Sequence, residues 1–323
     1  MCYSENRVII NGDDRMLKQK LGKSDLQVSN IALGCMRMSG LEESEVVNVL
    51  NTAVESGINL FEHADIYGGG TCEEVFSKGL QDAGIKREDI LIQTKAGIRP
   101  DLGMFDFSKA HLIHSVDQSL KRLKTDYVDI FALHRPDTLM DPEEVAEAFN
   151  TLQKSGKVRH FGVSNQNVGQ MELLQKYVDQ PLLVNQLQFS LMHTPMIDHG
   201  FNVNMKRDEQ SNDRDGGILT YTRLNEITIQ AWSPYQYGFF EGVFIDHPAF
   251  PKLNEKLEEI GRTYNVSKTV VATAWILTHP AKMQVVIGTM NAGRIADIAT
   301  ASSIRLTRHE WYDLYRAAGN VLP

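Results

Sequence analysis

The chain has 323 residues, a hydrophobic content of 42%, a charged content of 23% and a formal net charge of −8. This is the composition of a globular protein with a large core, and a negative charge without any basic stripe argues against a nucleic-acid-binding surface. No apolar run approaches the length of a membrane span, and the N-terminus lacks the apolar stretch of a signal peptide. Three scattered cysteines, Cys2, Cys35 and Cys72, lack metal-ligand spacing and suggest a reducing compartment. We therefore expect a cytoplasmic protein.

Eight short apolar runs follow one another from about residue 29 to the end of the chain. Most of them are continuously apolar rather than alternating, as expected for parallel strands that are covered on both faces. The expected strands are Ser29–Cys35, Ile58–Ala64, Ile90–Lys95, Tyr127–His134, Val158–Ser164, Leu182–Phe189, Thr228–Ser233 and Gln284–Thr289.

Amphipathic segments with readable start and stop signals separate these runs. The expected helices are Glu45–Ser56 after Ser44, one from Ser108 to Lys124, one from Asp141 to Ser155, one from Asn291 to about Ser302, and Thr307–Ala318. Strand and helix alternating eight times predict a (β/α)₈ TIM barrel. The competing doubly wound sheet needs a glycine-rich phosphate loop after its first strand, and residues 34–40 lack that spacing.

The barrel prediction assigns residues 1–323 to a single domain. Residues 1–28 are expected to form an N-terminal extension and hairpin, and residues 307–323 a C-terminal helix and tail. Residues 193–217 and 235–250 are expected to be loops on the active-site rim, where long loops usually act as lids or binding elements. The glycines at 68–70 are interpreted as a flexible turn.

Tyr67, Lys95 and His134 stand at or just past the ends of the second, third and fourth expected strands. In a barrel of parallel strands all the strand C-termini meet at one rim, so these residues are expected to converge on one pocket. A phenol, an ammonium and an imidazole together form a plausible proton-transfer device, because a nearby cation lowers the pKa of a phenol.

The motifs at the strand ends, in their order, resemble those of the aldo-keto reductase family. The matching segments are Ile31–Gly34, Gly57–Phe61, Ala64–Gly68, Thr94-Lys95, Asp126–His134, Gly162–Asn165, Asn185-Gln186, Trp232–Pro234 and Ile287–Thr289 with Arg294. The resemblance implies reduction of a small-molecule aldehyde or ketone by hydride transfer from NADPH, with NAD as the alternative cofactor and with no metal.

By the same resemblance, Tyr67 would be the general acid, Lys95 would lower the pKa of Tyr67, and His134 would orient the carbonyl. Ser164, Asn165 and Gln186 would bind the nicotinamide carboxamide, and Trp232 would stack on the nicotinamide. Ser233, Thr289 and Arg294 would hold the phosphates, Arg294 being suited to a ribose 2′-phosphate near a helix N-terminus. The remaining expected cofactor-binding residues are Gly34, Met36, Arg37, Pro234 and Gly288.

Two positions depart from the family pattern. The family carries an aspartate five residues before its tyrosine, where this chain has Glu62. We hypothesise that Glu62 still pairs with Lys95 but with some loss of rate, because catalysis is sensitive to displacements of about 1 Å; Asp65 is a candidate substitute. Gly288 stands where many NADP-preferring members carry a basic residue, which leaves Arg294 more isolated.

Two other functions stay open at this point. A cofactor-binding barrel that acts as a redox sensor is favoured by Glu62 alone. A metal-dependent hydrolase would draw on His63, Asp65, Lys95 and His134, but the chain offers no His-x-His pair and no late-strand aspartate. Because side chains alternate along a strand, His63 is expected to point away from the pocket as a satisfied structural histidine.

Overall fold

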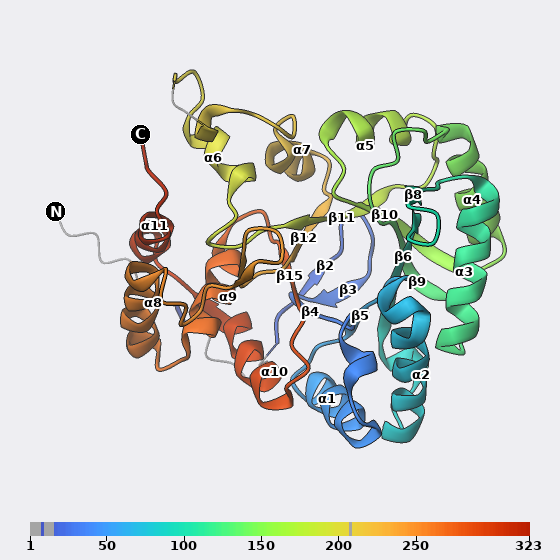
Figure 1. The fold of residues 1–323 in the computed structure, drawn as a ribbon, viewed down its shortest axis with the longest axis horizontal. Helices are drawn as coiled ribbons and strands as arrows, with labels where there is room; N and C mark the ends of the chain where they lie inside the picture. The colour runs from blue at the N-terminus through green and yellow to red at the C-terminus, as the bar shows by residue number, and fades with distance from the viewer. Residues whose placement is uncertain (1–7, 10–15, 207–208) are drawn as a thin grey trace.

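The computed structural model describes residues 8–9, 16–206 and 209–323. Its centre is a closed barrel of eight parallel strands (Figure 1), in which consecutive barrel strands are neighbours. The strands are β4 (Ile31–Gly34), β5 (Leu60–Glu62), β6 (Leu91–Ala96), β9 (Val128–Leu133), β10 (Val158–Ser164), β11 (Leu182–Gln188), β12 (Thr228–Trp232) and β15 (Gln284–Ile287). All eight coincide with expected strands, so the (β/α)₈ prediction is confirmed.

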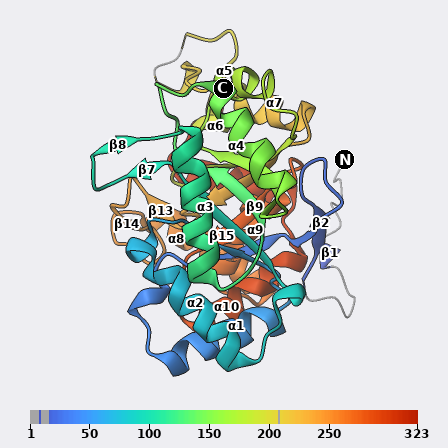
Figure 2. The same cartoon turned by 90° about the vertical axis from the view of Figure 1, so that its right-hand side faces the viewer.

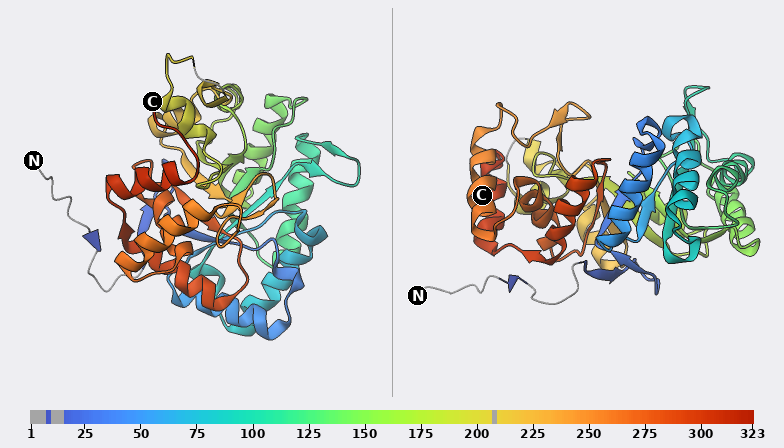
Figure 3. Two further views of the ribbon diagram at one scale, coloured as in Figure 1. Left: turned by 60° about the vertical axis from the view of Figure 1, so that its left-hand side comes forward. Right: turned by 90° about the horizontal axis from the view of Figure 1, so that it is seen from below.

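Helices surround the barrel and bury its outer face (Figures 1 and 3). They are α1 (Glu43–Glu55), α2 (Thr71–Ala83), α3 (Lys109–Leu123), α4 (Pro142–Lys154), α5 (Val168–Gln175), α7 (Ile218–Leu224), α9 (Lys268–Thr278) and α10 (Ala292–Ala299). Two more helices, α8 (Pro251–Tyr264) and α11 (Arg308–Ala317), lie outside α9.

Most of the expected helix starts are correct. Ser108, Asp141, Asn291 and Thr307 each accept a backbone hydrogen bond at the N-cap of their helix. The predicted start of α1 is wrong, because Glu42 rather than Ser44 is its N-cap and forms a capping box with Glu45. Helix α10 is also shorter than expected, since residues 300–303 continue as a 3₁₀ turn.

The N-terminal end of the barrel is closed by a hairpin of β2 (Lys18–Lys20) and β3 (Gln27–Ser29). Leu21 and Val28 from this hairpin are fully buried against apolar side chains inside the barrel. Of the expected extension at residues 1–28, residues 1–7 and 10–15 lie outside the described residues, and so does Cys2. The hairpin therefore plugs one end and leaves the other end for the site.

The opposite end carries two further hairpins, which project from the same side of the molecule in Figure 2. One consists of β7 (Ile98–Arg99) and β8 (Met104–Phe105), and the other of β13 (Gln236–Tyr237) and β14 (Gly242–Val243). The expected rim loops are therefore partly ordered as secondary structure: residues 235–250 hold the second hairpin, and residues 193–217 hold α6 (Pro195–Phe201) and the 3₁₀ turn η4 (Glu209–Ser211).

The glycines at 68–70 form a turn, as expected. They belong to a 3₁₀ turn, η2 (Tyr67–Gly70), and all three have positive φ, which L side chains rarely adopt. A Cβ on Gly70 would also lie 2.9 Å from the Arg122 side chain. Glycine is thus required there by backbone geometry and by close packing, and the turn fixes the position of Tyr67.

Two of the three cysteines lie in the described part of the chain. Cys35 and Cys72 are buried free thiols. No helix in the described part of the chain combines the length and the apolar character needed to cross a bilayer. The apolar surface of these helices instead faces the barrel in one large cluster of buried side chains.

Candidate active site

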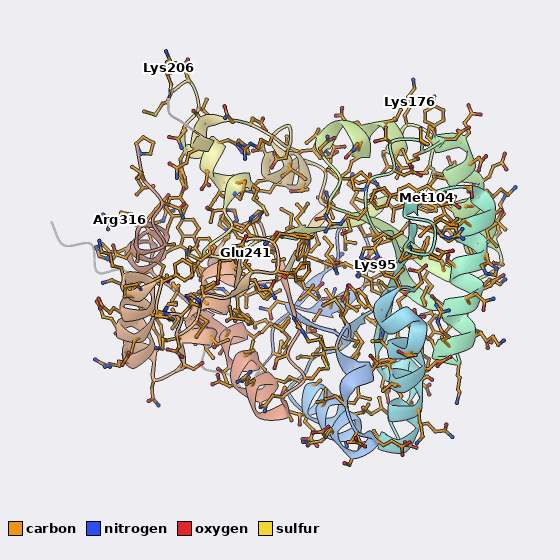
Figure 4. All side chains as sticks on the ribbon, viewed as in Figure 1. Lys95, Met104, Lys176, Lys206, Glu241 and Arg316 are labelled. Atoms are coloured by element: carbon orange, nitrogen blue, oxygen red, sulfur yellow. The ribbon has the colours of Figure 1, made fainter. Side chains whose placement is uncertain are left out.

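Lys95 is the centre of a buried polar cluster at the C-terminal end of the strands. Its side chain is fully buried and lies within the ring of strands in Figure 4. The Nζ group forms an ion pair with the Glu62 carboxylate and donates to the Tyr67 hydroxyl and the His63 carbonyl, each at 3.0 Å. An ammonium has three N–H donors, so every one of them has an acceptor. The expected pairing of Glu62 with Lys95 is confirmed.

Glu62 is seated by two residues that we had expected to contact the cofactor. Gly34 is its neighbour in the sheet, and a Cβ there would lie 3.1 Å from Glu62 Oε2. Gln186 Nε2 donates to Glu62 Oε1 at 3.2 Å. Gly34 is buried and makes room for the longer acidic side chain, while the amide nitrogen of Gln186 holds it from the other side. Both residues therefore hold the Glu62 carboxylate in place.

Glu62 also contacts the tyrosine directly, because the Tyr67 hydroxyl donates to Glu62 Oε1 at 3.2 Å. Asp65 does not take over the role of Glu62. Its side chain lines a separate cavity of about 270 Å³ with Arg99, His111 and Arg122, on the side of the strand that faces α3. Burial raises the pKa of Asp65 to about 7, and the nearby Glu73 adds to this effect.

Burial dominates the electrostatics of the cluster. It raises the pKa of Tyr67, with the Arg135 guanidinium opposing it. This direction is opposite to the lowered pKa that we expected, because desolvation of the phenolate outweighs the neighbouring cations. Burial likewise lowers the pKa of the Lys95 ammonium well below its ordinary value, and contact with the Glu62 carboxylate counteracts this.

His134 completes the expected catalytic group. Its ring meets the Tyr67 ring edge-on, with centroids 5.9 Å apart and an interplanar angle of 82°. Burial, with the positive charges of Lys95 and Arg135, lowers the pKa of His134 well below its ordinary value. The imidazole is therefore neutral at pH 7 and has one N–H group to donate to an oxygen atom.

His63 points away from this cluster, as expected, but it is not satisfied. Its ring is fully buried and packs edge-on against Phe76 at 4.4 Å. Within the described residues neither ring nitrogen has a hydrogen-bond partner. Burial accordingly lowers the pKa of His63 to about 3. The expectation failed because apolar side chains of α2 cover this face of the strand.

The residues expected to bind nicotinamide form a connected group. Asn165 donates through Nδ2 to Ser164 Oγ at 2.8 Å, and it accepts at Oδ1 from Trp232 Nε1 at 3.1 Å. Asn165 and Ser233 both have positive φ, with values of 56° and 50°. Such values in non-glycine residues are strained and cluster at binding sites. Pro234 follows as a buried residue that fixes the turn.

The expected phosphate site differs from the prediction in one respect. Arg37 donates to the Gly288 carbonyl at 2.9 Å, and a Cβ on Gly288 would lie 2.9 Å from the Arg37 guanidinium. A cation from the end of β4 therefore covers the position where Gly288 lacks a basic side chain. Arg294 is exposed in the first turn of α10, near Thr289, so it is not the only cation there. Met36, beside Arg37, is exposed.

The metal-site hypothesis finds no support at the barrel mouth. Among the described residues, one group of potential ligands comes close enough to share an ion, namely His199, Asp213 and Asp215. This group belongs to the segment after β11. This group does not include the histidines and the aspartate on which the hydrolase hypothesis depended, namely His63, His134 and Asp65.

Sequence reasoning missed two features of the site. Inside the barrel, Gln93, Gln230 and Gln284 donate and accept in a chain, with distances of 2.8 and 2.9 Å. Their signal was one glutamine within each of three expected strands. The second is Arg135, which follows His134 and lies half-buried over the aromatic rings of the mouth. Its signal was a charged residue beside a candidate catalytic one.

Residues 30–318 match the model of the Aldo/keto reductase family. The chain belongs to the aldo-keto reductase family. An uncharacterized oxidoreductase of Bacillus subtilis (strain 168), YcsN, is 36% identical over 305 residues, which cover 91% of this chain and 95% of that protein.

Other relatives give a consistent picture of this aldo-keto reductase. A 6-dehydroglucose reductase of Agrobacterium fabrum (strain C58 / ATCC 33970) is 34% identical over 93% of this chain and 98% of its own length. Among solved structures, the thermostable aldo-keto reductase Tm1743, in complex with the inhibitor epalrestat, has a TM-score of 0.74 and 26% identity, covering 94% of this chain and all of its own. The family, the barrel and the order of its strand-end motifs thus agree.

Proposed function

We propose that this protein reduces an aldehyde or ketone to an alcohol with NADPH and that Tyr67 is the general acid. The observation that supports this most strongly is the 3.0 Å contact between the Tyr67 hydroxyl and Lys95 Nζ in a buried site. A proton donor next to a buried cation can transfer its proton to a developing alkoxide, because the cation stabilises the phenolate that remains.

Each polar residue of the cluster has a defined part in this mechanism. Tyr67 donates the proton to the carbonyl oxygen, and Lys95 stabilises the phenolate. Glu62 holds Lys95 charged and in place. Neutral His134 donates a hydrogen bond to the same carbonyl oxygen, which orients it and polarises the bond before the proton arrives. Together these groups neutralise negative charge that develops on oxygen.

The cofactor would supply a hydride to the carbonyl carbon. Observations at two places fit its binding. The strained Asn165 and Ser233 flank Trp232, whose indole presents a partly exposed aromatic surface. Arg37 and Arg294 lie near the end of β15, where two guanidinium groups and a helix N-terminus suit phosphates, including a ribose 2′-phosphate. This favours NADPH over NADH.

A spectrophotometric panel of carbonyl compounds with NADPH and with NADH tests the proposal. The panel includes 6-dehydroglucose, because relatives at 34% and 32% identity are named 6-dehydroglucose reductase. We expect cofactor oxidation that Tyr67→Phe reduces by at least about 100-fold, in keeping with the usual contribution of general acid catalysis. If the variant kept wild-type turnover, Tyr67 would not be the acid.

A redox sensor is the second candidate, and it has one supporting observation. The Tyr67 hydroxyl already donates to Glu62, so its proton has a carboxylate acceptor within the protein. Stopped-flow mixing of the NADPH-loaded protein with a reactive aldehyde separates the two functions. An enzyme transfers hydride in the mixing experiment, whereas a sensor binds cofactor and leaves the aldehyde unreduced.

A further inference from the structure

Arg135 holds a position at the mouth that the proposed mechanism does not use. It directly follows His134 at the end of β9 and is half-buried. Its guanidinium carbon lies 5.6 Å from the ring centroid of Trp232 and 5.8 Å from that of Phe239. Guanidinium groups at such distances are attracted to aromatic faces. The two rings therefore hold Arg135 over the opening of the barrel.

Arg135 has no negative partner within the described part of the chain, where no carboxylate lies within ion-pair distance of it. Other partly buried arginines near this rim do have partners. Arg99 forms ion pairs with Asp101, and Arg122 with the buried Glu73. A partly desolvated guanidinium without a counter-charge is a favourable binding partner for a carboxylate or phosphate, because it can make two parallel hydrogen bonds to either group.

The location of Arg135 separates it from Thr289 and Arg294, two of the three expected phosphate-binding residues of the cofactor. In the closed barrel, β9 and β15 lie on opposite sides, four strands apart in either direction. Thr289 and Arg294 follow β15, whereas Arg135 follows β9. Arg135 is also close enough to Tyr67 for their charges to interact, and it adjoins His134. An anion on Arg135 would thus lie on the side of the mouth where the carbonyl is reduced.

We propose that Arg135 binds an acidic group of the substrate, so that this reductase acts on carbonyl compounds that carry a carboxylate or a phosphate. Phe239 contacts the apolar part of the substrate between the acidic group and the carbonyl. This inference rests on the proposed function and specifies its substrate class. Arg135 is a substrate-binding residue, and it sets specificity rather than the chemistry of proton transfer.

The test compares 2-, 3- and 4-carboxybenzaldehyde with their methyl esters, using NADPH. The rigid ring fixes the distance between the acid and the aldehyde, and each ester is a neutral control of similar shape. Arg135→Gln is expected to lower kcat/KM for the best acid by roughly 10- to 100-fold, mainly through KM, and for its ester by much less. For the acid, kcat/KM of Arg135→Lys should lie between the values of the wild-type protein and of Arg135→Gln, because lysine keeps the charge but lacks the planar guanidinium.

Arg159→Gln is the matched control variant. Arg159 also lies over an aromatic ring, that of Tyr127 at 3.7 Å, but it is at the start of β10, at the opposite end of the barrel. Arg159→Gln should leave the ratio of kcat/KM for the acid to kcat/KM for the ester at the wild-type value. An unchanged ratio in Arg135→Gln would overturn the proposal. Equal losses for acid and ester, together with a raised Kd for NADPH by fluorescence titration, would overturn it too and assign Arg135 to the cofactor.

Failure of the proposed function gives a different result. If the wild-type protein reduced none of these aldehydes with NADPH or NADH, the reductase activity would be refuted, and binding would test Arg135 without turnover. Benzoate should then quench tryptophan fluorescence in the wild-type protein and in Arg159→Gln more strongly than benzamide does. Loss of benzoate binding in Arg135→Gln, with weakened binding in Arg135→Lys, supports the anion site. Benzoate binding by Arg135→Gln equal to that of the wild-type protein, or no preference of the wild-type protein for benzoate over benzamide, overturns it.

Discussion

Replacing Glu62 with aspartate gives the sharpest test of how the carboxylate affects Tyr67. Glu62 Oε1 accepts from Lys95, from Gln186 and from the Tyr67 hydroxyl at 3.2 Å. The Tyr67 bond holds the proton that the mechanism has to release. Removing one methylene withdraws the carboxylate from Tyr67, while the long Lys95 side chain can follow it. Glu62→Asp should therefore free the hydroxyl and keep the ion pair.

The magnitude follows from this hydrogen bond. A distance of 3.2 Å is long for an O–H···O bond, so we assign it about 1 kcal/mol, at the low end for a bond to a charged acceptor. Loss of that ground-state stabilisation corresponds to a rise in kcat of about fivefold. The same change lowers the apparent pKa of Tyr67 by about 0.7. Because Tyr67 has to be protonated for reduction and burial raises its pKa, the alkaline fall in kcat lies above about pH 10, and in the variant it should move to lower pH.

The assay is the pH profile of kcat with saturating NADPH and a reactive aldehyde. Glu62→Gln keeps the length but removes the charge, so Lys95 loses its counter-ion and kcat should fall by at least about tenfold. Glu88→Asp makes the same methylene change at an exposed glutamate beyond the other end of the barrel and should have no effect. A kcat for Glu62→Asp at or below wild type, with an unshifted pH profile, would refute the idea that Glu62 slows this enzyme.

Three further predictions concern the cofactor, the carboxylate and stability. Arg37→Gln and Arg294→Gln should each raise the KM for NADPH by roughly tenfold and leave the KM for NADH nearly unchanged, which steady-state kinetics would check; equal effects on both cofactors would contradict a 2′-phosphate site. Gly34→Ala puts a Cβ 3.1 Å from Glu62 Oε2, so kcat should drop several-fold while the circular dichroism spectrum is retained; wild-type turnover would show that Glu62 adapts freely. The pKa of His63 is lowered to about 3 by burial, so as pH falls the unfolded chain binds the proton first and the free energy of unfolding decreases between about pH 6.5 and pH 3. From pH 7 to pH 5 His63 accounts for about 2 kcal/mol of this loss. Burial also lowers the pKa of His134 and of His279, so urea titrations should still show a loss in His63→Phe, smaller than in the wild-type protein by about 2 kcal/mol.

The fold was predictable from the sequence because the pattern that specifies it is local. Each barrel strand is a short run of apolar residues, and polar caps such as Ser108 and Asp141 mark where helices begin. Parallel strands then bring their C-terminal ends to one rim, which is why Tyr67 and Lys95 could be expected to meet. Helix α1 was predicted, but its first residue was not, because a glutamate, Glu42, caps it through a reciprocal capping box with Glu45.

The details of the site depended on which way side chains point across the barrel, and no local pattern gives that. Gln186 was expected to contact the cofactor, but the neighbouring Glu62 carboxylate offers its amide a charged acceptor inside the barrel. Gly288 indicated that the expected phosphate site lacks a cation, but the Arg37 guanidinium, from the end of another strand, contacts Gly288. Such contacts join residues more than 100 positions apart, so spacing along the chain carries no signal for them.

The two cations near Tyr67 have different consequences for its acidity. Lys95 forms an ion pair with the Glu62 carboxylate, whose negative charge offsets part of the positive charge that acts on the phenol. Burial therefore raises the pKa of Tyr67. Arg135 has no such partner among the described residues and opposes this rise. Arg135 therefore moderates the pKa of Tyr67, whereas its proposed part in the reaction is to bind the acidic group of the substrate.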